Sequence, residues 1–479
     1  MTLKNKIMSG AGWSTVAMLI TTAAQMTQII ILGRILSPEA FGTVALLMII
    51  ISFSEFFSQM GLSEAVIQES HPTRTELSTL YCLNILLGIG VFSILFGFNL
   101  IAEHLNFISN ITPYLPYIAV TFFILPWGQL HKALLQKNLI FKPIAIGESF
   151  ASVTGTIAAV ICAYNGLEIW SLIIGYLIKC IISTIILMVS GWSLLKFTTK
   201  IQFTSIQRYL HFGLNLMAGN IFNFINSRID QILVGSILGT QALGYYSMAF
   251  NLVLQPISKI NPILTSIAFP VLTRFKSQPE RLKSGYLNML NLVATINAPL
   301  LFGVSAVAPL LIPLLIGDQW IPAIPIIQVL AIYAFIRSLG NAGGSLILAC
   351  GRAELSLQWN MMLTLFIPIT IFVSAHFFGL IGVATGLVLL QVILFFVWYF
   401  RIVKLLIGPC IIPYINSILI ATATSIAMFL TIKLIPSNIL VSELSNLILL
   451  ISCGVVFYTV TNIILRKNEI LNLIKSRSK

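Results

Sequence analysis

The stretch Leu380-Ile-Gly-Val-Ala-Thr-Gly-Leu-Val-Leu-Leu-Gln-Val-Ile-Leu-Phe-Phe-Val-Trp-Tyr-Phe400 contains 21 residues and no charge. An α-helix rises about 1.5 Å per residue, so about 20 such residues cross the hydrocarbon core of a bilayer. The whole chain of 479 residues has the same character, with 58% hydrophobic residues, 9% charged residues and a mean hydropathy of +0.98. A water-soluble protein of this length needs more surface charge. The sequence therefore predicts an all-α integral membrane protein.

About fourteen apolar stretches along the chain have this length. We expect transmembrane helices at 12–33, 41–62, 79–101, 113–130, 144–163, 167–190, 209–232, 243–266, 286–307, 324–348, 357–375, 380–400, 411–432 and 444–465.

The basic residues gather in alternate connections between these stretches. With the N-terminus in the cytoplasm, 21 of the 27 Lys and Arg residues fall on the cytoplasmic side, and only Arg34 and Lys433 fall outside. This is the positive-inside rule, and it predicts an even number of spans with both termini cytoplasmic. The net charge of +13 then reflects topology, and we expect no nucleic-acid partner because the charges are scattered over short loops. The six cysteines have no metal-binding spacing and are predicted to be free thiols.

The chain contains an internal repeat. Ile35-Leu-Ser-Pro-Glu-Ala-Phe-Gly42 matches Ile237-Leu-Gly-Thr-Gln-Ala-Leu-Gly244 at four of eight positions, with an offset of 202 residues. Because six spans separate the two octets, the repeats have the same orientation in the membrane. We therefore predict two pseudo-symmetric six-helix lobes, at 1–195 and 196–405, followed by two accessory helices and a cytoplasmic basic tail at 406–479.

A polar stripe lies on one face of the span at 209–232. It consists of Asn220, Asn223, Ser227, Asp230 and Gln231. At the repeat offset, three of these positions become Thr21, Gln25 and Gln28 in the first span. A polar stripe in lipid must face protein or water. Two interpretations remain open, namely a water-filled cavity between the lobes and hydrogen bonding between packed helices.

Six charged residues fall inside the predicted spans: Lys179, Arg228, Lys259, Arg337, Glu55 and Asp230. A charge at the bilayer centre costs about 2.5–3.5 kcal/mol on translocon scales, so each of these residues needs a structural or functional explanation. One explanation is pairing of opposite charges between helices, and Glu55 with Lys259 is a candidate pair across the lobes. Four cations against two anions leave two positive charges, which suit an anionic partner such as a diphosphate. Arg337 is the first candidate, because the flexible run Gly340-Asn-Ala-Gly-Gly344 follows it.

Several short motifs, in this order and spacing, resemble Wzx-type bacterial oligosaccharide flippases. These are Ser9-Gly-Ala-Gly-Trp13, Gly33-Arg-Ile-Leu36, Phe41-Gly42, Gly61-Leu62 and Ile67-Gln68. Further stretches are similar to colanic-acid-exporter-like members: Leu134-Leu-Gln-Lys-Asn-Leu-Ile-Phe-Lys142, Gly147-Glu148, Phe269-Pro270 and Gly351-Arg352. These flippases form the polysaccharide-transport branch of the multidrug/oligosaccharidyl-lipid/polysaccharide superfamily, and the resemblance covers the whole chain.

The resemblance implies two six-helix lobes around a central cavity and alternating access. The implied cargo is an isoprenoid-diphosphate-linked oligosaccharide, which moves from the cytoplasmic to the outer face of the bacterial inner membrane. The family has no strict signature for cargo residues, so physics alone places Arg337, Arg228, Lys179 and Lys259 as the cations of the cavity. Glu55 or Asp230 is expected to titrate and to couple transport to a proton or sodium gradient.

The sequence also bears on the partners of the protein and on alternative functions. Besides the lipid bilayer, glycan polymerase or assembly proteins are expected partners, and neither a cofactor nor a metal is expected. One alternative is a drug/cation antiporter of the same superfamily, which a surplus of acidic cavity residues would favour. Another is a membrane-integral glycan polymerase or glycosyltransferase, which would need an acidic cluster on an outer loop. The predicted spans have a basic surplus and the outer loops have no such cluster, so we expect a transporter and no enzyme.

Overall fold

The computed structural model describes residues 3–70, 72–104, 110–195, 197–198, 200–436 and 442–465. Within these residues every regular element is a helix and no strand occurs. Many of the helices are long and apolar enough to cross a membrane. The prediction of an all-α, multi-pass integral membrane protein is confirmed. The predicted basic tail after 465 lies outside the described residues.

The predicted number of fourteen spans is not confirmed. The described residues form 11 helices that are long and apolar enough to span, or up to 12 if the bent pair Leu115–Ile124 and Pro126–Lys137, with its 44° bend, is one span. Two of these helices, α10 with 68 residues and α13 with 46 residues, are longer than one crossing needs. Each contains one residue with a non-helical backbone, Gly239 in α10 and Gly379 in α13. The sequence pattern divided each of these helices into two spans at about these glycines.

The chain divides into two compact units. The N-terminal unit is Met1–Arg228 and the C-terminal unit is Ile229–Lys479, so the boundary falls inside α10. The lobe boundaries predicted at 195 and 405, and the superposition of the two lobes, stay predictions.

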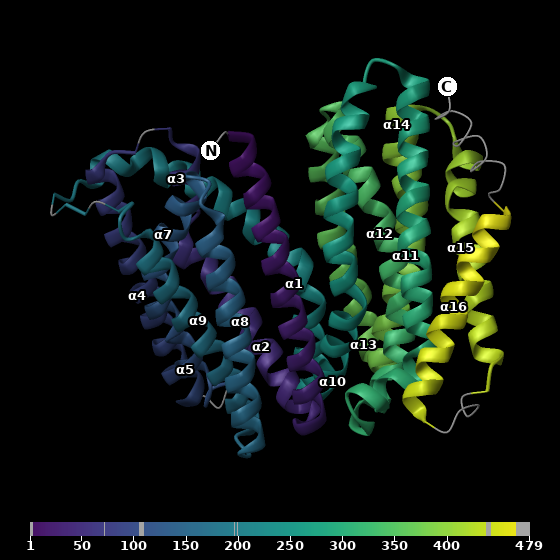
Figure 1. The fold of residues 1–479 in the computed structure, drawn as a ribbon, viewed down its shortest axis with the longest axis horizontal. Coiled ribbons are helices and arrows are strands. Elements are labelled where there is room, and N and C mark those ends of the chain that lie inside the picture. The colour runs from purple at the N-terminus through teal and green to yellow at the C-terminus, as the bar shows by residue number, and fades with distance from the viewer. Residues whose placement is uncertain are drawn as a thin grey trace. The chain divides into compact units, whose positions relative to one another are not determined.

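Within the described residues, the N-terminal unit is built from one short 3-10 helix and nine α-helices, with the first part of α10. They are α1 (Leu3–Ile35), α2 (Pro38–Gln59), α3 (Leu62–Gln68), α4 (Arg74–His104), α5 (Leu115–Ala119), α6 (Thr121–Ile124), α7 (Pro126–Lys137), α8 (Phe141–Tyr164), α9 (Glu168–Gly191), η1 (Phe203–Ile206) and α10 (Gln207–Arg274). Helix α8 packs between α1 and α9, and the three run side by side in Figure 1.

The break between α1 and α2 follows from local chemistry. Ser37 is the N-cap of α2, and its hydroxyl accepts a hydrogen bond from the Ala40 backbone N–H at 3.3 Å. Pro38 follows at the first helical position, where its missing N–H costs nothing. In the second octet of the sequence repeat, Gly239 occupies the position that matches Ser37, and it interrupts α10 with φ 85°. Both octets therefore contain a helix break at equivalent positions.

Another set of contacts holds the start of α10 within the N-terminal unit. Thr73 and Glu76 form a capping box at the beginning of α4, with Thr73 N–H donating to the Glu76 carboxylate at 2.8 Å. The same carboxylate accepts from Arg208 at 2.9 Å and from the Tyr209 hydroxyl at 3.2 Å. Because the Glu76 carboxylate accepts hydrogen bonds from residues at the beginnings of both helices, it fixes the beginning of α10 against the beginning of α4.

The C-terminal unit contains the rest of α10 and the remaining helices. They are α11 (Pro279–Leu315), η2 (Asp318–Ala323), α12 (Ile324–Cys350), α13 (Ala353–Trp398), the π-helical turn η3 (Tyr399–Val403), α14 (Lys404–Ile407), α15 (Ile411–Leu434) and α16 (Glu443–Leu465). Helix α11 packs against α12, α15 and α16. Met428, Ile432 and Leu450 form part of the apolar core between α11, α15 and α16.

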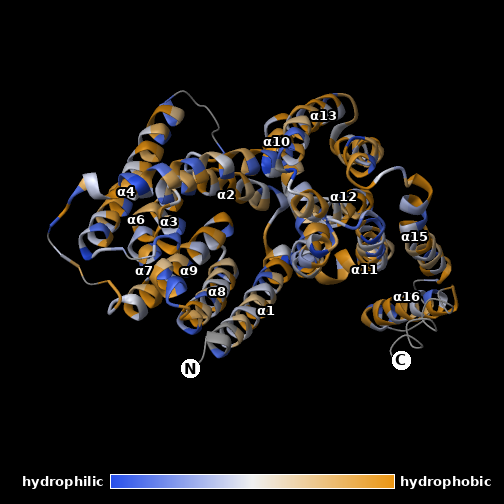
Figure 2. Ribbon diagram, turned by 90° about the horizontal axis from the view of Figure 1, so that it is seen from above, coloured by the Kyte–Doolittle hydropathy of each residue, from blue (hydrophilic) through white to orange (hydrophobic). Residues whose placement is uncertain are grey.

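Large apolar side chains are exposed on the helices of both units. Ile94 is 71% exposed, Phe378 75% and Leu389 66%. Figure 2 shows many hydrophobic residues on α13, α15 and α16. This surface is unsuited to water and suits lipid. All six cysteines are free, as predicted.

Candidate functional site

A cavity of about 170 Å³ with both polar and apolar walls lies inside the N-terminal unit, between α1, α2, α8 and α9. Two of the predicted stripe residues, Gln25 and Gln28, line it together with the predicted cation Lys179. Ser152 and Thr156 of α8 add hydroxyl groups, and the Thr156 hydroxyl lies 3.4 Å from Gln28 Oε1. The cavity therefore combines one ammonium group with amides and hydroxyls, a set that suits a polar or anionic ligand.

Small residues make room for the lysine in this cavity. Helices α8 and α9 approach closely at Gly155 and Gly175, where a Cβ atom on Gly155 would lie 2.7 Å from the Gly175 carbonyl oxygen. The same Cβ would lie 2.9 Å from Cβ of Lys179. The stem of Lys179 thus lies over the bare backbone of Gly155, as small residues permit in packed membrane helices. Lys179 is half-buried, and its position in a wall of the cavity reduces the cost of a charge inside the membrane.

Glu55 of α2 belongs to the surroundings of this lysine. Its half-buried side chain interacts electrostatically with Lys132 and Lys179. Among the described residues these contacts are longer than salt bridges, whereas Lys132 forms a salt bridge of 2.6 Å with Glu148. Tyr176, which lines the cavity, also interacts electrostatically with Glu55. Glu55 therefore faces positive charge within its own unit, and the predicted Glu55–Lys259 pair stays untested.

The other stripe residues of the N-terminal unit are placed differently. Thr21 is half-buried, and its hydroxyl donates to the Ala17 carbonyl at 2.8 Å. Asn220 and Asn223 are exposed. Ser227 is half-buried and donates to the Phe224 carbonyl at 2.9 Å. The structure therefore brings Gln25 and Gln28 into one cavity with Lys179, while the hydroxyls of Thr21 and Ser227 are bonded to their own helices.

A second polar cluster lies in the C-terminal unit and contains two predicted residues, Asp230 and Arg337. Asp230 is 7% exposed and accepts a hydrogen bond of 2.9 Å from the hydroxyl of Tyr246, which is fully buried. Arg337 donates from Nη1 to the Tyr333 hydroxyl at 3.0 Å, and its guanidinium carbon lies 5.7 Å from the centre of the Tyr333 ring. Arg337 also interacts electrostatically with Asp230 and Tyr246. Two tyrosines thus link the predicted anion to the predicted cation.

The degree of exposure separates the members of this cluster. The side chain of Arg337 is exposed, whereas Tyr333 is 5% exposed and Tyr246 is buried. The guanidinium has five N–H donors, and one contact to Tyr333 leaves most of them available for a bidentate contact with a phosphate. Tyr333 therefore holds the arginine from its buried side.

The remaining predicted residues are Lys259, Arg228 and Gln231. Lys259 is exposed and Arg228 is half-buried. Gln231 is 3% exposed. Whether these side chains, or those of the two clusters, contact cargo stays a prediction.

The sequence analysis missed the residues that support the predicted charges. Tyr333 lies four residues before Arg337, a spacing that places two side chains on the same helical face and could have revealed the pair. Asn261 and Asn297 were also missed. Both are buried, and Nδ2 of Asn297 donates a hydrogen bond of 2.9 Å to Oδ1 of Asn261. No sequence signal pointed to Tyr246, which lies far from Arg337 in the chain. Among the described residues, no three His, Cys, Asp or Glu side chains gather as a metal site.

Comparisons with known proteins identify the family. A model of the family described as "Polysaccharide biosynthesis protein" matches residues 31–325. The lipopolysaccharide biosynthesis protein WzxC of Escherichia coli (strain K12) is 32% identical over 420 residues, which cover 87% of this chain and 85% of that protein. An uncharacterized membrane protein in the cps region of Klebsiella pneumoniae is 32% identical and covers 98% of this chain and 97% of its own length.

A solved structure shows the same fold. The lipid II flippase MurJ, in an inward closed conformation, aligns with a TM-score of 0.72, and the alignment covers 95% of this chain and 99% of that one at 14% identity. The predicted resemblance to polysaccharide-transport proteins is confirmed by the family model and by the two relatives over nearly the whole chain. The chain therefore belongs to the polysaccharide biosynthesis protein family and has the fold of the lipid II flippase.

Proposed function

We propose that this protein is an alternating-access flippase that carries an isoprenoid-diphosphate-linked oligosaccharide from the cytoplasmic to the outer face of the bacterial inner membrane. The observation that carries the proposal is the match over 87% of the chain to a lipopolysaccharide biosynthesis protein. The fold of a lipid II flippase supports it, because the name of that protein describes flipping of lipid II. The proposal makes the protein a transporter without a catalytic centre.

The two polar clusters give this function a physical basis. A diphosphate inside a membrane protein needs cations that replace its water. Lys179 in the cavity of the N-terminal unit supplies a point charge, and the exposed guanidinium of Arg337 supplies a planar donor. Gln25, Gln28 and the nearby hydroxyls provide hydrogen-bond partners for sugar.

Glu55 provides a route for coupling to an ion gradient. Without cargo, the negative carboxylate faces Lys179 and offsets its charge. When a diphosphate approaches the lysine, the two anions repel, and protonation of Glu55 or binding of a sodium ion to its carboxylate relieves the repulsion. We propose the same role for Asp230, which interacts electrostatically with Arg337.

The proposed orientation follows the distribution of charge in the sequence. Both termini are cytoplasmic, so the loops rich in Lys and Arg meet the cytoplasmic leaflet, where the cargo is assembled. Glycan polymerase or other assembly proteins are proposed partners on the outer side, because the flipped cargo is their substrate.

A reconstitution assay tests this function. The purified protein is placed in liposomes that contain a fluorescent isoprenoid-diphosphate disaccharide, and an impermeant quencher reports the fraction of cargo in the outer leaflet. We expect movement that depends on the protein and on an imposed proton or sodium gradient, and that fails for Lys179→Ala. Lys404→Ala, at an exposed lysine in the short helix α14, is the matched control and should move cargo normally. Movement that equals that of empty liposomes would refute the proposal.

A further inference from the structure

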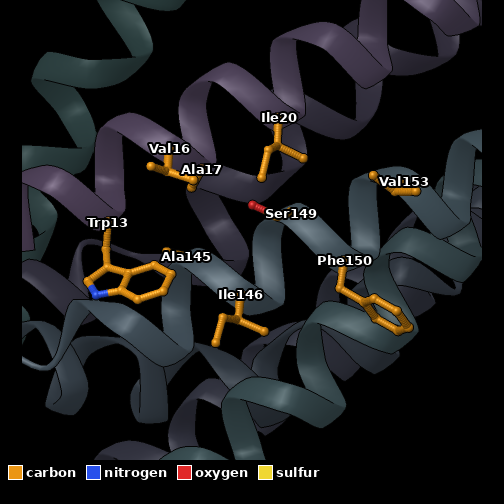
Figure 3. Close-up of a pocket in the computed structure, with 9 residues that line it drawn as sticks. All are labelled: Trp13, Val16, Ala17, Ile20, Ala145, Ile146, Ser149, Phe150 and Val153. Atoms are coloured by element: carbon orange, nitrogen blue, oxygen red, sulfur yellow. The ribbon is translucent and has the colours of Figure 1, made fainter.

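An apolar groove of about 300 Å³ lies between α1 and α8 of the N-terminal unit. Figure 3 shows its walls, with Trp13, Val16 and Ile20 on α1 and Ile146 and Phe150 on α8. Several wall side chains are exposed, including Val16 at 46% and Phe150 at 55%. Since both helices are long and apolar enough to cross a membrane, this groove opens toward the surroundings of the unit rather than into its core.

A close helix contact and a charged side chain mark one end of the groove. A Cβ atom on Gly10 would lie 2.5 Å from the ring of Phe141, so α1 and α8 nearly touch here. Trp13 follows Gly10 by about one turn of α1. The ammonium of Lys142, at the start of α8, lies 5.4 Å from the centre of the Trp13 ring. Tryptophan and lysine are typical of the boundary between hydrocarbon and head groups. This end of the groove therefore lies at the membrane surface.

The charge at this end is positive. Lys142 is exposed and forms no salt bridge with any carboxylate in the part of the chain that the structure describes. Glu148, the acidic residue of α8, is paired with Lys132 at 2.6 Å. Lys142 therefore offers one cation beside the end of an apolar groove.

We propose that this groove binds one acyl chain of an anionic phospholipid, with the lipid phosphate on Lys142. The distance from Trp13 to Ile20 along α1 is about 10 Å at 1.5 Å per residue, and one leaflet has a hydrocarbon thickness of about 15 Å. The groove thus follows an acyl chain over much of its leaflet. A single ammonium matches the single phosphate of phosphatidylglycerol, whereas a diphosphate carries more charge than Lys142 balances. The site is independent of the cargo proposed above.

Native mass spectrometry of the intact protein tests the site. The wild type is purified in detergent, mixed with phosphatidylglycerol or phosphatidylcholine, and the retained lipid is counted. Lys142→Gln removes the charge, and Val16→Trp fills the groove. Matched controls are Lys404→Gln at another exposed lysine and Leu19→Trp, a residue of α1 that is 61% exposed and outside the groove walls. A single Lys near a membrane surface is worth about 1 kcal/mol, which corresponds to an affinity change of about fivefold.

The outcomes separate this site from general lipid binding. We expect Lys142→Gln to lower retention of phosphatidylglycerol about fivefold and Val16→Trp to lower it at least as much, while both controls retain as much as the wild type. Phosphatidylcholine should be retained weakly by all variants. Equal retention of phosphatidylglycerol by the wild type, Lys142→Gln and Val16→Trp would overturn the proposal. Displacement of phosphatidylglycerol by an equimolar isoprenyl diphosphate would also overturn it, because the groove would then hold the carrier lipid.

Discussion

Replacement of Arg337 by alanine tests whether the exposed guanidinium binds cargo. If it grips a phosphate bidentately, Arg337→Ala removes two charge-assisted hydrogen bonds, each worth about 1.5–3 kcal/mol. The lower values together amount to about 3 kcal/mol, or a loss of about 150-fold in apparent cargo affinity. Arg337→Lys keeps the charge and one contact, so we expect a loss of about tenfold. The assay is surface glycan in cells that lack their own flippase, with the amount of each variant in the membrane measured in parallel.

The effect on folding should be much smaller. Asp230 keeps its 2.9 Å hydrogen bond from Tyr246 when Arg337 is removed. Because the side chain of Arg337 is exposed, its removal leaves no cavity in a packed core. We therefore expect Arg337→Ala to reach the membrane in nearly normal amounts while glycan export is lost.

A double variant separates cargo binding from charge balance. If Arg337 serves only to balance Asp230, then Asp230→Asn should restore export to the Arg337→Ala protein, because the unbalanced carboxylate is gone. If Arg337 binds cargo, the double variant should export as poorly as the single one and should bind the isolated cargo as weakly, a readout that the coupling role proposed for Asp230 does not affect. Rescue by Asp230→Asn, or normal export by Arg337→Ala at equal abundance, would refute our reasoning.

Three further predictions concern packing, coupling and topology. Gly155→Ala should lower the thermal unfolding temperature measured in detergent, because its Cβ would lie 2.7 Å from a carbonyl oxygen of α9, whereas Gly97→Ala meets nothing within 4 Å and should not. Glu55→Gln should leave cargo binding intact and abolish the dependence of reconstituted transport on an imposed proton or sodium gradient; full gradient dependence would exclude Glu55 as the coupling residue. In a cysteine-free background, the cysteines of Asn138→Cys and Gln278→Cys should not react with an impermeant thiol reagent applied to intact cells. Labelling of either cysteine would contradict the proposed orientation.

The fold was largely predictable from the sequence because a bilayer imposes a simple rule. Every backbone polar group must be satisfied within the membrane, so long uncharged stretches become helices. The span count was harder to predict, since it depends on how a break in a helix is treated. Gly239 and Gly379 interrupt the backbone geometry of α10 and α13 without ending either helix by hydrogen bonding. The span at 113–130 was predicted as one helix, but Pro126 begins a separate helix, α7, and the pair is bent by 44°.

The candidate site was predictable only in part. A charge inside a predicted span is visible in a sequence, because its cost is large wherever the neighbours are. This is how Lys179, Arg337 and Asp230 were found. The groups that make such charges tolerable include residues of other helices and of distant parts of the same helix, and their positions depend on packing. Gly155 permits Lys179 to lie across α8, and no single-sequence pattern distinguishes this glycine from one that only packs.

The tyrosines of the C-terminal unit show why the prediction of charge pairing from the sequence was incomplete. Counting four cations against two anions assumed that only opposite charges stabilise a charge in the membrane. Tyr246 instead donates to Asp230, and Tyr333 accepts from Arg337, so neutral hydroxyls satisfy part of each charged group. A phenol performs this role well, because its ring packs among apolar residues while its hydroxyl forms the hydrogen bond. The buried side of Arg337 is thus satisfied within the protein, and its exposed side remains able to bind an anion that comes and goes.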